Sequence, residues 1–338
     1  MKLIVFGPCR LGCLLDNGSI VDLNHAYAAV LEREGEPRYY AKANAQVPSN
    51  LLAFIEEGAA GIDAAKRAVA LVKSGVKEGP TGERLLYKAG EVKIHAPLPS
   101  LASRIAMIGT NFYDHTADYL SMRDGVKVTK DDVRKSVEEG KHEPWGFWKF
   151  PRNVVGPDEP VIYPARTQRL DYETEVAAVF GKKGKDVPED EAMDYIYGYT
   201  IVNDVSARDT AQGGRGLFLS KNFDSSTPMG PCIVTADEVG NPHVLAIRTK
   251  INGELRQNGS QKDMIRQYPF WVSFLTSDMT FYPGDMIATG TCSGTALDTT
   301  PRDADGNMAP DKFLKPGDVI ESWVEKIGTL RNPVIAKK

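Results

Sequence analysis

Two glutamates, Glu173 and Glu175, stand two positions apart in a segment, residues 170–181, that otherwise has the composition of a β-strand. Residues two apart on a strand point to the same face, so both carboxylates point together, with Asp171 on the same side. Side-by-side carboxylates cost Coulomb energy unless a positive charge lies between them. The spacing therefore predicts a bound cation.

A third carboxylate could come from Asp204, at the end of an apolar strand expected over residues 195–205. Three carboxylates without a histidine or a thiol among them suit Mg²⁺, Mn²⁺ or Ca²⁺ rather than zinc. An ion held in this way keeps positions free for water and for a chelating substrate. A Glu-x-Glu pair alone is more often a polar stripe that faces solvent, so the metal site needs support from other parts of the chain.

The elements that would position these residues indicate an α+β fold that is mainly β. From residue 151 onward the chain reads as short strands bounded by Gly, Pro, Asp and Asn, without βαβ alternation, which is typical of a sandwich or a rolled barrel. Residues 1–25 resemble a β-hairpin. Two helices are expected near residues 51–55 and 65–72, where apolar side chains recur at helical spacing.

A domain boundary is expected near residue 100. The segment 79–99 is polar and contains several Gly and Pro residues, which is typical of a linker. The chain of 338 residues is long enough for roughly two domains. We therefore expect a small α+β N-terminal domain at residues 1–100 and a catalytic domain at residues 101–338.

The composition restricts the classes of partner. The formal net charge of -4 gives no support to nucleic-acid binding, which needs a basic face. No run approaches the roughly 18 apolar residues of a membrane span, and the first strand turns at Gly7 and Pro8 before a signal peptide could form. The 4 cysteines lack the pattern of a disulfide or zinc scaffold, so we expect a cytoplasmic protein with reduced thiols.

Several longer sequence motifs accompany the carboxylates, at residues 111–115, 170–175, 197–209, 220–224, 278–291 and 313–318. Their composition and their order resemble the fumarylacetoacetate hydrolase family, from about residue 105 to residue 335. The first 100 residues resemble the small N-terminal domain of larger family members more loosely. The resemblance implies the mixed β-sandwich roll of that family as the fold of the catalytic domain, and it suggests a homodimer.

The resemblance also implies the metal ligands and the catalytic residues. Glu173, Glu175 and Asp204 would bind Mg²⁺, or else Mn²⁺ or Ca²⁺. His115 would be the base that activates water, and Lys221 would act with it by stabilising an alkoxide. These roles depend on the family resemblance and not on spacing alone.

The substrate-binding residues implied by the resemblance are Tyr113, Arg208 and Thr291. Arg208 could instead pair with Asp209 or Glu173 and hold the strands together. The family usually has a glutamate three residues after its histidine, and here that position is Asp118. Residues three apart on a helix share a face, so we expect Asp118 to orient His115 or the water.

The implied reaction is hydrolytic cleavage of a carbon–carbon bond in a 1,3-diketo acid, such as an acylpyruvate, by metal-enolate chemistry and a water activated by His115. Decarboxylation or tautomerisation of an oxo acid, and dehydration or hydrolysis of a 2-keto-3-deoxy sugar acid, would use the same metal site. A catalytically silent oligomeric binding protein is a further alternative. If the protein is an enzyme, its expected partner is a small oxo-acid substrate.

The charged segment that follows the histidine admits two interpretations. Residues 119–148 could form a lid over the site or a solvated surface insertion. Trp145, Phe147 and Trp148 close this segment. They could line the mouth of the substrate site or pack in the core.

Overall fold

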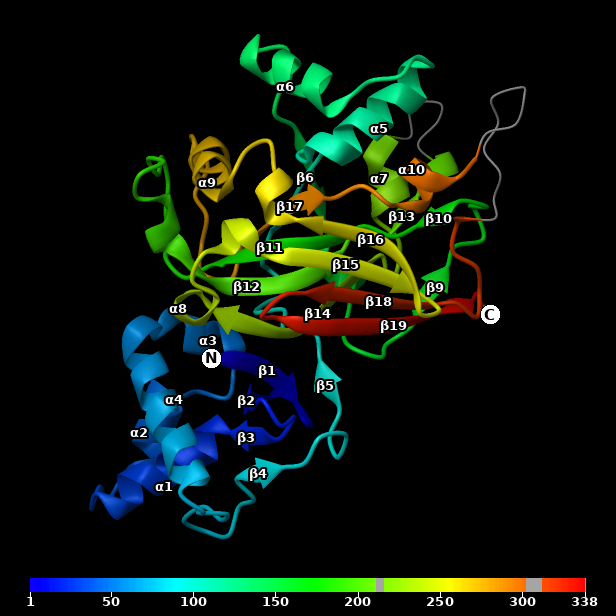
Figure 1. The fold of residues 1–338 in the computed structure, drawn as a ribbon. Helices are drawn as coiled ribbons and strands as arrows, with labels where there is room; N and C mark the ends of the chain where they lie inside the picture. Colours follow the sequence, from blue (N-terminus) through cyan, green and yellow to red (C-terminus); the bar gives the residue numbers. More distant parts are fainter. Residues whose placement is uncertain (211–215, 302–311, 338) are drawn as a thin grey trace.

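The computed structural model describes residues 1–210, 216–301 and 312–337, whose strands form a large sheet, a smaller sheet and a short pair (Figure 1). Within these residues the large sheet has 12 strands, in the order β4-β3-β2-β1-β14-β12-β11-β17-β6-β7, with β5 beside β1 and β8 beside β14. These strands are β1 (Lys2–Phe6), β2 (Arg10–Leu14), β3 (Ile20–Asp22), β4 (Leu86–Tyr87), β5 (Ile94–His95), β6 (Ile105–Ile108), β7 (Gly146–Lys149), β8 (Val154–Val155), β11 (Thr174–Phe180), β12 (Ile196–Asn203), β14 (Thr227–Thr235) and β17 (Met286–Thr291).

The smaller sheet has the order β16-β15-β18-β19-β9 in the described residues, and β10 pairs with β13 beside it. These strands are β9 (Val161–Tyr163), β10 (Leu170–Asp171), β13 (Ser206–Ala207), β15 (Ala246–Ile251), β16 (Glu254–Ser260), β18 (Val319–Val324) and β19 (Gly328–Ala336). Mixed sheets with segregated helices confirm the predicted α+β class that is mainly β.

Most of the helices lie toward one of the two ends of the molecule, and others flank the sheets (Figure 1). The described α-helices are α1 (Leu23–Arg33), α2 (Tyr39–Gln46), α3 (Leu51–Glu56), α4 (Gly58–Lys73), α5 (Tyr113–Asp124), α6 (Lys130–Glu138), α7 (Gly216–Lys221), α8 (Ala236–Val239), α9 (Tyr268–Thr276) and α10 (Ala296–Thr299). The two helices expected near residues 51–55 and 65–72 correspond to α3 and α4, whereas α1 and α2 were not expected. Among the described helices, none combines the length and the apolar character that crossing a membrane would require.

Strand β11 is buried on both faces. Val176, Ala178 and Phe180 pack in one apolar core together with α9 and with strands of the smaller sheet. Ala177 and Val179 pack in a second core, which contains the apolar faces of α1 and α4. The large sheet therefore separates two cores, and both cores support the residues at the end of β11.

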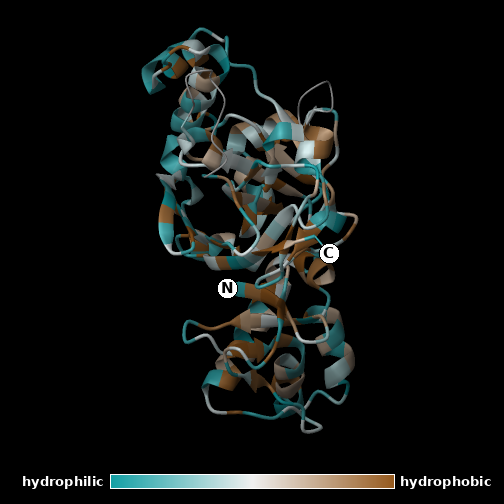
Figure 2. Cartoon of the chain, turned by 90° about the vertical axis from the view of Figure 1, so that its right-hand side faces the viewer, coloured by the Kyte–Doolittle hydropathy of each residue, from teal (hydrophilic) through white to brown (hydrophobic). Residues whose placement is uncertain are grey.

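The N-terminal residues continue the large sheet. Strand β1 pairs antiparallel with β14, which places Leu3 opposite Ile233. Figure 2 shows apolar segments where the N-terminal part meets the rest of the chain, and mainly hydrophilic colours on the helices at the opposite end, α5 and α6. The division into domains at residue 100 stays a prediction, because one sheet runs through both parts.

The single strand expected over residues 170–181 is divided in two. β10 ends at Asp171 and β11 begins at Thr174, so Tyr172 and Glu173 lie between them. Two side chains satisfy the backbone at the break: the N–H of Tyr172 donates to the carboxylate of Asp171 at 2.8 Å, and the N–H of Glu173 donates to the side-chain oxygen of Asn203 at 3.0 Å. Strand alternation therefore does not by itself place Glu173 beside Glu175.

Candidate active site

The three predicted metal ligands come together where β11 begins and β12 ends. The pairing of these strands places Thr174 opposite Asn203, which brings their neighbours Glu173 and Asp204 together. The N–H of Asp204 donates to the carbonyl oxygen of Glu173 at 2.8 Å. With Glu175 they form a buried group in which each carboxylate offers an oxygen within 4.8 Å of the others.

The carboxylates of Glu173 and Glu175 lie in opposite electrostatic situations. Burial, together with the negative charges of Asp204 and Glu173, raises the pKa of Glu175 well above its usual range. Burial acts in the same direction on Glu173, but the positive charges of Arg208 and Lys221 hold the pKa of that carboxylate well below its usual range. The negative charge of Glu173 is therefore balanced by positive side chains of the protein, whereas the negative charge of Glu175 is not.

These residues fit a divalent cation. The three donors are hard oxygens, which Mg²⁺ and Mn²⁺ prefer, and they lie close enough together for one ion to contact all of them. Glu175 accepts a hydrogen bond from the N–H of Gly290 at 2.9 Å, and no lysine or arginine pairs with it among the described residues. A bound cation would supply the charge that Glu175 lacks.

Two lysines hold Asp204 from its two sides. Nζ of Lys221 donates to Oδ2 of Asp204 and to Oε2 of Glu173, both at 2.6 Å. Nζ of Lys149 donates to Oδ1 of Asp204 and to the carbonyl oxygen of Ser226, both at 2.7 Å, and the Lys149 side chain is completely buried. Lys149 was not expected in this role, because a lysine among aromatic residues in a short strand usually faces solvent.

Arg208 bridges Asp171 and Glu173. Its Nε donates to Oδ2 of Asp171 at 2.9 Å, and its Nη2 donates to Oε1 of Glu173. Asp171 also accepts the backbone N–H groups of Ala296 at 2.7 Å and of Leu297 at 3.1 Å, so this carboxylate holds the start of α10 against the site. The ion pair with Glu173 is the structural role considered for Arg208, and contact with substrate stays a prediction.

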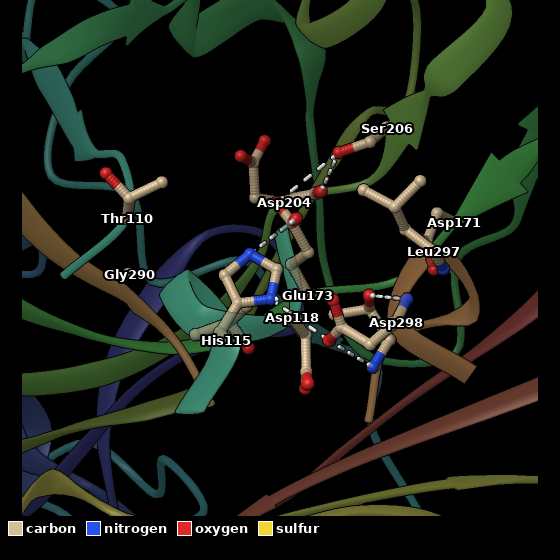
Figure 3. A network of polar contacts seen from close by, with 12 residues as sticks. Thr110, His115, Asp118, Asp171, Glu173, Asp204, Ser206, Gly290, Leu297 and Asp298 are labelled. Atoms are coloured by element: carbon tan, nitrogen blue, oxygen red, sulfur yellow. Dashed lines mark hydrogen bonds and ion pairs between the residues drawn. The ribbon is translucent and has the colours of Figure 1, made fainter. Parts of the chain in front are cut away.

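His115 projects from the first turn of α5 toward Glu173, and Asp298 of α10 holds its ring (Figure 3). Its Nδ1 lies 3.0 Å from Oδ2 of Asp298, and its Nε2 lies 3.9 Å from Oε1 of Glu173. Burial opposes a charge on the ring, but the carboxylate of Asp298 raises the pKa of His115 to about 9. Asp298 is itself fixed, since it forms a capping box with Thr295 at the start of α10.

Asp118 forms no hydrogen bond with His115 in the described part of the chain, while a role in orienting the water stays a prediction. The carboxylate of Asp118 instead accepts the hydroxyl of Ser293 at 2.5 Å. Asp298 occupies the orienting position, 183 residues further along the chain than His115. This role of Asp298 was not expected, because the pattern Thr295-x-x-Asp298 is that of an ordinary helix cap.

The two other predicted substrate-binding residues lie in different surroundings. Thr291, in β17, lines the same cavity as the carboxylates, and its hydroxyl donates to the carbonyl oxygen of Thr174 at 2.8 Å. Tyr113 is not among the described residues that line this cavity. Its ring packs beside the guanidinium of Arg134 from α6, which lies 5.1 Å from the ring centre.

The site opens into a cavity of about 240 Å³ that polar and apolar side chains line together. The polar lining residues include His115, Glu173, Glu175, Asp204, Ser206, Arg208, Lys221 and Thr291. The apolar lining residues include Ile108, Tyr119, Met122, Trp145, Phe147, Leu217 and Leu297. Residues 119–148 therefore contribute part of the wall, while movement of this segment as a lid stays a prediction. Trp148 is not among the described residues that line the cavity, and its ring centre lies 6.3 Å from that of Phe281.

Several known proteins are similar to this chain in sequence and in fold over most of its length. The oxaloacetate tautomerase YisK of Bacillus subtilis is 34% identical over 327 residues, which cover 96% of this chain and 95% of that protein. The human mitochondrial oxaloacetate tautomerase FAHD2A is 32% identical over 291 residues, which cover 86% and 81% respectively. The structure of a fumarylacetoacetate hydrolase from Exiguobacterium antarcticum has a TM-score of 0.70 and 29% identity, and the match covers 100% of both chains.

A family model described as "Fumarylacetoacetate (FAA) hydrolase C-terminal" matches residues 104–335. This range agrees with the range in which the sequence motifs resemble the family, about residues 105–335. The match and the relatives confirm that resemblance, and they show that the chain belongs to the fumarylacetoacetate hydrolase family, a family of enzymes.

Proposed function

We propose that this protein is a divalent-metal-dependent enzyme that interconverts the enol and keto forms of a small 2-oxo acid. The observation that carries the proposal is the placement of His115. Asp298 holds its Nδ1, and the free Nε2 faces the carboxylate group in a cavity of about 240 Å³. The relatives that are named oxaloacetate tautomerases support the proposal, because their reaction is such an interconversion.

The residues of the site divide the reaction between them. A divalent ion held by Glu173, Glu175 and Asp204 would polarise the 2-oxo group as a Lewis acid. In the direction from enol to keto acid, the protonated ring that the raised pKa of His115 favours donates a proton from Nε2 to C3 and regains one from the 2-hydroxyl group, so no atom is gained or lost. Asp298 keeps the ring in one orientation throughout. Tautomerisation thus needs one proton carrier and no attacking water.

Hydrolysis of a carbon–carbon bond in a 1,3-diketo acid is the second candidate. In its neutral form, which the raised pKa makes the minor one near neutral pH, His115 could instead take a proton from water, and a base held by an orienting carboxylate such as Asp298 is common in hydrolases. Lys221, which lies between Glu173 and Asp204, could then stabilise the alkoxide that forms. Both reactions use the same residues, so only the products distinguish them.

Product analysis of the purified protein with Mg²⁺ or Mn²⁺ tests the two candidates. A tautomerase accelerates the decay of the ultraviolet absorbance of enol-oxaloacetate and leaves its carbon skeleton intact in NMR spectra. A hydrolase converts an acylpyruvate into pyruvate and a carboxylic acid. If the protein accelerates neither reaction in the presence of either ion, the proposed function is wrong.

A further inference from the structure

The backbone of Glu173 is tied to the end of β12 at two points. Its N–H donates to Oδ1 of Asn203 at 3.0 Å, and its carbonyl oxygen accepts the N–H of Asp204 at 2.8 Å. Glu173 lies between β10 and β11, so these two hydrogen bonds fix its backbone at a point where neither strand continues. One of the expected metal ligands is therefore held by the residue that carries another and by the asparagine beside it.

Asn203 is itself held by the smaller sheet. Its Nδ2 donates to the hydroxyl oxygen of Ser322 in β18 at 3.0 Å, and the hydroxyl of Thr174 donates to the same oxygen at 2.8 Å. The opposite orientation of the amide would turn its NH₂ group toward the N–H of Glu173, where two donors would meet. Ser322 therefore favours the orientation in which Oδ1 of Asn203 faces Glu173.

This contact is closed to solvent. The exposed fraction is 1% for Asn203, 1% for Ser322 and 5% for Glu173. A buried backbone N–H that loses its acceptor has no bulk water to replace it, so the backbone tends to shift toward another acceptor. Removal of the Asn203 side chain should therefore move Glu173.

The position of Glu173 matters because the carboxylate oxygens of Glu173, Glu175 and Asp204 lie within 4.8 Å of one another, as one shared ion requires. We propose that Asn203 and Ser322 are positioning residues of this cation site, which set the place of Glu173 relative to Asp204 and thereby the affinity for a divalent ion. Neither is among the described residues that line the cavity. This inference rests on the divalent ion of the proposed function.

The test measures the binding of Mn²⁺ to the purified protein by isothermal titration calorimetry, without substrate. Residues that orient metal ligands typically contribute about 10–100-fold to metal affinity. We therefore expect Asn203→Ala to raise the Kd for Mn²⁺ by about 10–100-fold. Ser322→Ala should raise the Kd in the same direction by a smaller factor, because Asn203 keeps its acceptor but loses the contact that orients its amide.

Asn332→Ala is the matched control. Asn332 is 2% exposed, and its Nδ2 donates to the carbonyl oxygens of Gly156 and Glu159, both at 2.8 Å, so it also ties a neighbouring segment to a strand. Its removal should lower the urea midpoint and leave the Kd for Mn²⁺ unchanged.

Two results would overturn the inference and leave the proposed function standing. One is an unchanged Kd in Asn203→Ala, and the other is an equal rise in Asn203→Ala and Asn332→Ala, since a general loss of stability would then explain both. If Asn203→Ala fails to fold, Ser322→Ala decides, and an unchanged Kd in that variant refutes the positioning role. A wild-type protein that binds no Mn²⁺ would contradict the proposed function itself, and the inference with it.

Discussion

Replacing Lys149 with methionine should destabilise this protein strongly when divalent ions are removed. The Lys149 side chain is completely buried, and its Nζ donates to Oδ1 of Asp204 and to the carbonyl oxygen of Ser226, both at 2.7 Å. Methionine has a similar shape but no donor, so both oxygens would lose this hydrogen bond inside the protein. Removing one partner of a buried ion pair costs about 3–5 kcal/mol. Because Lys221 still pairs with Asp204, we expect the low end, about 3 kcal/mol.

Urea unfolding followed by tryptophan fluorescence measures this loss, first in EDTA and then with Mg²⁺. The loss should be smaller with Mg²⁺, since a cation beside Asp204 replaces part of the missing charge. Lys66→Met is the matched control. Lys66 pairs with Asp237 at 3.2 Å on the surface, where both side chains are more than half exposed, so its loss should stay below about 1 kcal/mol. If Lys149→Met costs no more than this control, the buried ion pair does not have the role assigned to it.

Three further outcomes test the site. His115→Asn should lower kcat by about 100-fold or more, since general acid–base groups contribute about 10²–10⁴-fold; nearly unchanged turnover would remove His115 from the mechanism. Asp298→Asn should cause a loss of similar size in initial rates, and Asp118→Asn a loss below about tenfold; the opposite order would return the orienting role to Asp118. EDTA should abolish turnover, and Mg²⁺ or Mn²⁺ should restore it and raise the melting temperature. No thermal shift with either ion would favour a silent binding protein.

The carboxylate group could be predicted from the sequence because the family resemblance added to the local spacing of the acidic residues. Glu173 and Glu175 are two residues apart, and Asp204 follows a strand whose apolar pattern is plain. The register of β11 and β12 then brings Asp204 beside Glu173, because Thr174 lies opposite Asn203. The break of the strand before Thr174 could not be predicted, since it depends on a hydrogen bond from the backbone of Glu173 to the side chain of Asn203, 30 residues away.

Asp298 and Lys149 could not be predicted because each acts across a long sequence separation. Asp298 meets His115 from 183 residues away, and its local pattern already has a sufficient explanation as a helix cap. Lys149 meets Asp204 from 55 residues away. Asp118 looked like the better partner for His115 because helical geometry places it nearby, but its hydrogen bond goes to Ser293. The rule that residues three apart on a helix share a face does not account for Asp298, a competing acceptor on another helix.

The charges around the site explain why a cation belongs there. Within the described part of the chain, the carboxylates of Asp171, Glu173, Glu175 and Asp204 face the cationic side chains of Arg208, Lys221 and Lys149. Every carboxylate except Glu175 has a cationic partner among these, so the group is one positive charge short. The raised pKa of Glu175 is the consequence, because a buried carboxylate without compensation favours its protonated form. A divalent ion would turn this shortage into an excess of one positive charge, and a site with that charge would attract the carboxylate of a 2-oxo acid.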